Sequence, residues 1–143
     1  QGERVFIPDN LYVIGTMNIA DRSLALVDLA LRRRFAFVNL EPRLNDRWKA
    51  WCSEQAKIDE ASIMLIQQLF AELNDEIAGD RSLGPQFRIG HSYVTPTKDE
   101  VINSPREWLR QIVKTEISPL LDEYWYDNPD RAKKLTGRLL EAL

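Results

Sequence analysis

Apolar residues in the first 42 positions form two short continuous runs separated by an amphipathic stretch. One run covers residues 11–17, follows a Pro-Asp-Asn turn signal and is rich in β-branched side chains; the other covers residues 35–40 and ends at a Glu-Pro pair. Such runs predict buried strands of a parallel sheet. Between them, apolar positions at spacing i, i+3 and i+7 predict a helix that Asp21 or Ser23 can cap.

A strand, a helix and a second strand in this order make one βαβ unit. A single unit cannot bury a parallel sheet on both faces, because such a sheet needs several strands and helices on either side. We therefore expect residues 1–42 to be the end of a larger α/β core whose other strands lie outside this sequence.

From residue 43 onward the pattern becomes helical. Asn45 is expected to cap one helix, and Asp59 a longer one that ends at Gly79. Residues 80–97 are loop-like, because Gly, Pro and Ser interrupt every periodic stretch.

Two further helices are expected before the end of the sequence. Ser104 and Glu107 predict a capping box around Pro105 at the first helical position. That helix should kink or restart near Pro119, and a last helix should begin after Asn128. The predicted fold class is therefore an α/β remnant over residues 1–42, followed by a mainly α-helical four-helix module over residues 43–143.

Composition restricts the function. The chain has 143 residues, 44% hydrophobic and 29% charged, with a net charge of −3, which is typical of a globular protein without a global nucleic-acid signature. Cys52 and His91 are each the single residue of their type, which excludes an internal disulfide and makes a zinc site unexpected. No run is long enough to span a bilayer and no signal peptide is recognisable, so we expect a cytoplasmic protein without a metal of its own.

Two motifs carry a family resemblance. Residues 17–23 read Met-Asn-Ile-Ala-Asp-Arg-Ser, and the helix that follows ends in three arginines and Phe35. This stretch resembles the McrB-type GTPase subunit of modification-dependent restriction systems, a family of the AAA+ superfamily, in which Thr is usual at the position of Ile19. Residues 88–93, Arg-Ile-Gly-His-Ser-Tyr, are similar to a stretch in the helical lid of the same family.

The resemblance implies an architecture and an activity. Residues 1–42 would be the C-terminal part of the AAA+ core, with the sensor 1 strand, the arginine-finger helix and the last strand, and residues 43–143 would be the lid. The complete protein would form hexameric rings, hydrolyse GTP with Mg²⁺ and engage a McrC-type endonuclease. It would act on DNA that carries modified bases such as 5-methylcytosine, through an N-terminal domain outside this sequence.

Asn18 is the first candidate catalytic residue. It follows the predicted strand, and the carboxyl ends of strands in open α/β sheets are where ligand-contacting groups lie. A neutral amide there can orient water or contact phosphate, and the resemblance implies the sensor 1 role. The simpler interpretation is an asparagine that satisfies a turn at the strand end.

Arg32, Arg33 and Arg34 close the predicted helix. Cations at a helix C-terminus offset the helix dipole, by about 0.3–1 kcal/mol each, and one arginine would suffice for that. The resemblance implies that Arg33, or failing that Arg34, is an arginine finger for a neighbouring subunit, where such a residue contributes about 10³–10⁵ in rate. Arg32 is expected to be solvated.

Three residues are candidates for nucleotide binding. Asp21 and Arg22 lie in a loop that the family links to guanine preference, and a carboxylate can accept from the N1 and N2 donors of guanine. Asp21 is equally suited to capping the helix. The resemblance places Arg88 where AAA+ lids carry a second sensor of the γ-phosphate. The alternative is that Arg88 is an ordinary surface arginine. The nearby His91 is expected to be structural.

These 143 residues contain neither a Gly-x-x-x-x-Gly-Lys-Ser/Thr phosphate loop nor an apolar strand ending in Asp-Glu for magnesium. We therefore expect the chain alone to be no enzyme and to hold no cofactor. Two alternatives stay open: an ATP-driven MoxR-like or dynein-related motor, and a stand-alone helical adaptor that binds protein or DNA. A phosphate loop encoded upstream would favour a motor.

Overall fold

The computed structural model describes residues 6–17 and 33–143, and divides the chain into two compact units, residues 1–37 and 38–143. The candidate residues Asn18, Asp21 and Arg22 lie outside the described residues, as does the predicted helix up to Arg32.

Residues 6–17 and 33–40 are without strands, so the two predicted buried strands are not shown among the described residues. The turn at Pro8 is present, because the Leu11 N–H donates to the Pro8 carbonyl at 3.2 Å. The side chains that follow are exposed, however, and Ile14 is 94% accessible. A strand exists only where a neighbour completes its hydrogen-bond ladder, and no such neighbour is present among the described residues. A βαβ unit is therefore not shown.

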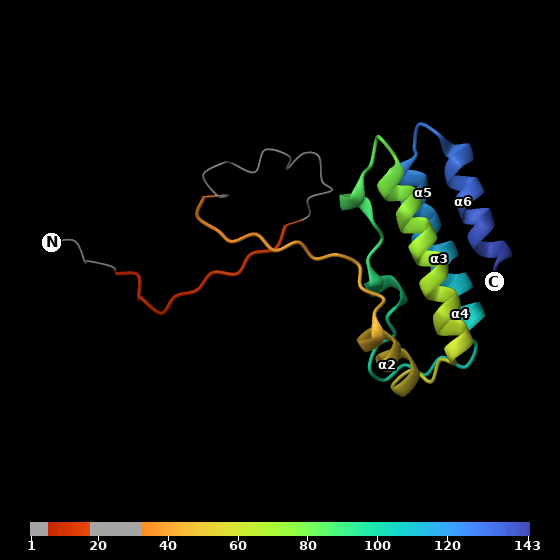
Figure 1. Cartoon of the computed structure of the whole chain (residues 1–143), viewed down its shortest axis with the longest axis horizontal. Helices are drawn as coiled ribbons and strands as arrows, with labels where there is room; N and C mark the ends of the chain where they lie inside the picture. Colours follow the sequence, from red (N-terminus) through yellow and green to blue (C-terminus); the bar gives the residue numbers. More distant parts are fainter. Residues whose placement is uncertain (1–5, 18–32) are drawn as a thin grey trace. The chain divides into compact units, whose positions relative to one another are not determined.

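The second unit is helical, as predicted (Figure 1). Its elements in chain order are α2 (Asp46–Glu54), α3 (Glu60–Gly79), the 3₁₀ turns η2 (Pro85–Phe87) and η3 (His91–Val94), α4 (Pro105–Ile112), the π-helical turn η4 (Val113–Ile117), α5 (Ser118–Tyr124) and α6 (Pro129–Glu141).

Three of the four predicted helix starts have the expected side-chain cap. The side chains of Asn45, Asp59 and Asn128 each accept a hydrogen bond from the backbone N–H three residues later. Such a bond satisfies one of the donors that a helix start leaves free. The capping box at the start of α4 is wrong in part: Ser104 is the N-cap residue, but its side chain makes no capping bond, and Glu107 accepts from Gln111 instead.

The predicted break at Pro119 is absorbed without ending the helix. Proline has no N–H to donate to the carbonyl four residues earlier, which here is that of Thr115. That carbonyl lies inside η4, where one turn widens to π geometry, and the Thr115 hydroxyl donates to the Gln111 carbonyl at 3.0 Å. As a result α4, η4 and α5 follow one another without interruption.

Helix α3 spans the helical unit and is contacted by α2, η2 and α4, while α5, α6 and η4 contact one another (Figure 1). The segment between α3 and α4 runs back along α3, and the continuous helix from α4 to α5 then runs beside it. After a turn, α6 runs in the direction opposite to α5. One continuous core joins them, and its fully buried side chains include Phe70, Ile66, Ile77, Ile89, Leu109, Ile117 and Leu121. None of the helices in the described part is long and apolar enough to cross a membrane.

Candidate functional site

The two candidate finger residues belong to the first unit. Arg33 and Arg34 lie in a turn directly before Phe35, and both are exposed. Exposed guanidinium groups are free to contact another molecule, although exposure alone does not distinguish a finger from a solvated helix end.

Arg88 belongs to the second unit and lies directly after η2. It is only partly exposed, and its Nε atom is buried with no hydrogen-bond partner among the described residues. Unpaired buried donors are rare in folded proteins, and a charged one has a strong preference for a negatively charged acceptor. The Arg88 side chain is therefore not fully solvated.

The residues on both sides of Arg88 are anchored. The ring of Phe87 packs edge-on against Tyr124 of α5, with 5.2 Å between ring centroids. Burial raises the pKa of Tyr124 to about 12, so this tyrosine stays neutral. On the other side, Ile89 is 1% exposed and lies in the core. The Arg88 side chain therefore starts from a backbone segment whose two neighbouring residues are both packed.

Asn74 of α3 holds this segment through its side chain. The Asn74 Nδ2 donates to the Ile89 carbonyl at 3.0 Å, and the Asn74 Oδ1 accepts from the Ile89 N–H at 2.6 Å. Sequence reasoning missed this residue, although a signal exists: between Phe70 and Ile77 it occupies a core-facing position of the helical pattern that a polar residue rarely takes.

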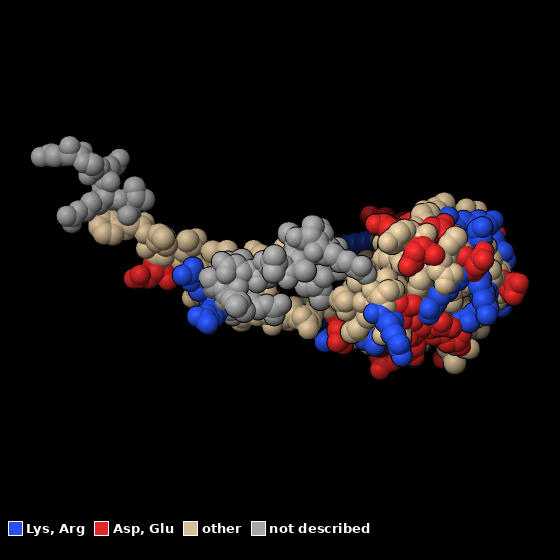
Figure 2. Space-filling view, turned by 90° about the horizontal axis from the view of Figure 1, so that it is seen from above, with Lys and Arg blue, Asp and Glu red and all other residues tan. Residues whose placement is uncertain are grey.

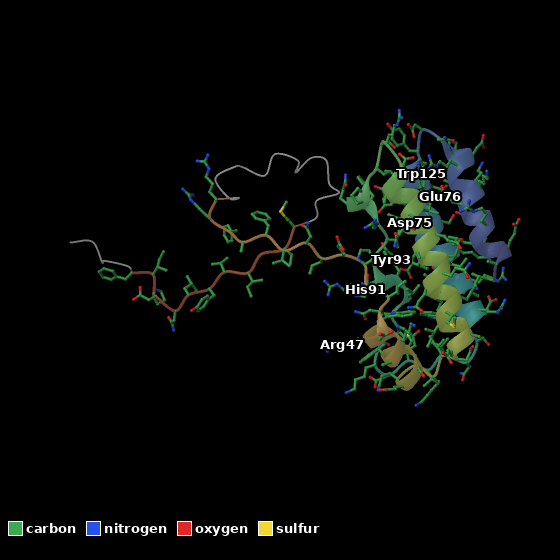
Figure 3. All side chains as sticks on the ribbon, viewed as in Figure 1. Arg47, Asp75, Glu76, His91, Tyr93 and Trp125 are labelled. Carbon is green, nitrogen blue, oxygen red and sulfur yellow. The ribbon has the colours of Figure 1, made fainter. Side chains whose placement is uncertain are left out.

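His91 makes a hydrogen bond of the kind expected for a structural histidine. Its Nδ1 accepts from the Arg43 backbone N–H at 3.2 Å. The Gln67 side chain donates to the Leu44 carbonyl one residue further on, at 2.5 Å. These two bonds, here called the entry latch, fix the chain where it enters the helical unit. Figure 3 shows His91 between α2, which carries Arg47, and the middle of α3.

Two tryptophans of α2 extend the attachment to the same loop. Trp48 Nε1 donates to the Thr95 hydroxyl at 3.1 Å, and Trp51 Nε1 donates to the Pro96 carbonyl at 2.9 Å. The loop-like region predicted for residues 80–97 therefore has fixed contacts with α2, α3 and α5. The tryptophans act as anchors and not as a platform for stacked bases.

Charge on the helical unit is mixed. On the face seen in Figure 2, lysine and arginine side chains alternate with aspartate and glutamate, without a large area of one sign. Protein surfaces that bind nucleic acid are typically strongly and contiguously basic. This face gives no support to the alternative of a DNA-binding adaptor.

Comparison with known proteins agrees with the helical fold. Residues 65–133 match the family model described as McrB, alpha-helical lid domain. The chain is also 42% identical over 139 residues to the type IV methyl-directed restriction enzyme EcoKMcrB subunit of Escherichia coli strain K12, an alignment that covers 96% of this chain. The chain spans 30% of the length of that relative. Residues 65–133, with Asn74 and Arg88 among them, therefore form a McrB-type alpha-helical lid domain, and the chain belongs to the McrB family.

Proposed function

We propose that this chain provides the lid, the sensor 1 residue and the arginine finger of a GTP-hydrolysing motor subunit in a McrBC-like restriction system. The observation that carries the proposal is the 42% identity to a methyl-directed restriction enzyme subunit over 96% of this chain, which extends well beyond the lid. In the complete protein, residues 11–17 and 35–40 would form strands of the core sheet, because neighbouring strands would then complete their hydrogen bonds.

The proposed site lies between subunits of a hexameric ring. Asn18 would orient the attacking water at the nucleotide of its own subunit, and Asp21 and Arg22 would contact the guanine or the facing subunit. Arg33, with Arg34 as the second choice, would reach the nucleotide of the neighbouring subunit. This role requires an exposed side chain, as Arg33 has, because a finger acts across an interface.

Arg88 would complete the site from the lid. Its buried, unpaired Nε fits an anionic acceptor such as a phosphate oxygen. When bound, GTP with Mg²⁺ supplies the phosphoryl group whose transfer to water these residues promote by positioning and by positive charge. The proposed partners are other copies of the subunit, a McrC-type endonuclease and modified DNA bound by a different domain, and the proposed location is the cytoplasm.

Nucleotide turnover by the complete protein tests this function. The protein should hydrolyse GTP in the presence of Mg²⁺ and prefer it over ATP, and a McrC-type partner should stimulate the reaction. Preference for ATP would favour a MoxR-like or dynein-related motor. Failure to hydrolyse either nucleotide, in a preparation that forms rings, would favour the adaptor.

A further inference from the structure

The side chain of Asn74 is a buried amide on a helix whose other core positions are apolar. Asn74 is 8% exposed, and the other buried residues of α3 are apolar. Its amide satisfies both backbone groups of Ile89, in the manner of a strand neighbour. Because both bonds go to one residue, the backbone at Ile89 cannot rotate without breaking at least one of them.

This pair of hydrogen bonds lies one residue away from Arg88. An arginine side chain has several rotatable bonds, so its guanidinium is placed precisely only where the backbone from which it starts and the side chain itself are both held. Here the backbone is held by Asn74 on one side and by the Phe87–Tyr124 contact on the other. The Arg88 Nε is meanwhile buried and unpaired among the described residues, so the guanidinium is held ready for an acceptor from elsewhere.

We propose that Asn74 is a positioning residue, which holds the backbone at Ile89 so that Arg88 is aimed at the terminal phosphates of the bound nucleotide. This inference rests on the proposed function, in which Arg88 contacts phosphate. Asn74 itself does not touch the nucleotide. Its contribution is the preorganisation of a cation, which lowers the barrier because the group need not be ordered during the reaction.

Steady-state kinetics of the complete protein test the proposal. Arg88→Ala and Asn74→Ala should each lower kcat for GTP by about tenfold or more, with KM changed by less than about threefold, because a preorganised cation acts mainly on the transition state. The double variant should be no slower than Arg88→Ala alone, since Asn74 acts only through Arg88.

Leu69→Ala is the matched control. Leu69 lies on the same helix and has the same exposed fraction, 8%, but it makes no hydrogen bond to the segment that carries Arg88. If Asn74→Ala acts only by destabilising the lid, Leu69→Ala should lower kcat as much as Asn74→Ala does. We expect kcat of the control to stay within about twofold of the unchanged protein, because truncation of a core residue away from the site leaves the site geometry intact.

The 143-residue chain provides an independent readout. Hydrogen exchange should show a protected Ile89 amide in the unchanged chain, and that protection should be lost in Asn74→Ala while amides of α3 stay protected. If Asn74→Ala does not fold, Asn74→Asp replaces it, because the carboxylate has the same shape and keeps the bond from the Ile89 N–H but cannot donate to its carbonyl.

The outcomes separate the inference from the function. If Arg88→Ala leaves kcat unchanged, the phosphate-contacting role of Arg88 is wrong and the inference falls with it. If Arg88→Ala is slow while Asn74→Ala behaves like Leu69→Ala, the proposed function stands and the inference about Asn74 is overturned. Additive losses in the double variant would also overturn it, because they would mean that Asn74 acts independently of Arg88.

Discussion

The guanidinium of Arg131 donates to the Asp80 Oδ2 at 2.6 Å, which joins the start of α6 to the end of α3. The same oxygen accepts from Trp125 Nε1 at 3.0 Å, and the guanidinium lies over the Trp125 ring, 4.8 Å from its centroid. The Asp80 side chain is 8% exposed, whereas that of Arg131 is 36% exposed. One carboxylate therefore holds together the C-terminal ends of α3 and α5 and the first turn of α6.

Asp80→Ala should destabilise the helical unit by about 2 kcal/mol, because it leaves the indole N–H and the guanidinium without their charged acceptor. Partial exposure of Arg131 limits the loss, since water can replace part of the interaction. Glu76→Gln is the control. Glu76 pairs with Arg131 at 3.7 Å and with Arg138 at 3.1 Å, but its side chain is 38% exposed, so the substitution should cost less than about 1 kcal/mol. Urea unfolding followed by circular dichroism measures both; equal losses would contradict the assignment.

The same carboxylate predicts a dependence of stability on pH. Hydrogen bonds from Ser82, and then from Trp125, hold the pKa of Asp80 at about 2, well below its usual range. A lowered pKa in the folded state adds stability that is fully present above about pH 4, the unfolded value, and is lost as the pH falls toward the folded pKa.

The difference in unfolding free energy between the unchanged chain and Asp80→Asn should therefore shrink as the pH is lowered from about 5 to 2. Urea titrations at several pH values measure this difference, and other acidic groups cancel because both chains contain them. A difference that stays constant over this range would contradict the role given to Asp80.

The entry latch predicts a specific site of proteolysis. Trypsin cleaves after arginine and so recognises the Arg43–Leu44 peptide bond. This peptide bond lies between two backbone groups that are hydrogen-bonded, the Arg43 N–H, which donates to His91, and the Leu44 carbonyl, which accepts from Gln67. Gln67→Ala should speed cleavage there by about fivefold, the equivalent of losing one hydrogen bond of about 1 kcal/mol. Gln68→Ala is the control, because Gln68 bonds only to the exposed Glu72 of its own helix. Mass spectrometry of the early fragments would contradict the latch if both variants were cleaved alike.

Most of the helical unit could be predicted from the sequence because its helices begin with local signals. Asn45, Asp59 and Asn128 cap helices through bonds that span only three residues, so the neighbouring sequence suffices to find them. The π turn before Pro119 could not be predicted, because a missing N–H can be accommodated by a kink, a restart or a widened turn.

The candidate site was predictable only in part. Arg88 could be named from its motif, but its unpaired Nε and the clamp from Asn74 depend on a contact across 15 residues of sequence. The strands at residues 11–17 and 35–40 could not be settled for another reason. Their apolar pattern is typical of buried strands, yet a strand forms only where a neighbour completes its hydrogen bonds, and residues 6–17 and 33–143 contain no such neighbour.

The chain alone should not bind GTP with useful affinity. Most nucleotide affinity in such motors comes from backbone amides around the β- and γ-phosphates, and these 143 residues contain no phosphate loop. Calorimetric titration of the 143-residue chain with GTP and Mg²⁺ should give no measurable heat of binding. A dissociation constant in the micromolar range would mean that the lid binds nucleotide by itself, contrary to our account.

The central claim is that Asn18 and Arg33 of one chain serve two different nucleotide sites. In the complete protein, Asn18→Ala and Arg33→Ala should each reduce GTP turnover by about 10²-fold or more. In rings assembled from an equal mixture, about one quarter of the interfaces would combine an intact Asn18 with an intact Arg33 from the neighbour.

The most direct test is therefore the GTP turnover of that mixture, with native mass spectrometry to confirm that mixed rings form. We predict recovery toward about one quarter of the unchanged rate if the interfaces act independently, and no recovery when either variant is mixed with the double variant. Mixed rings without any recovery would contradict the shared site, and full turnover by Arg33→Ala alone would show that the arginine run is only a solvated helix end.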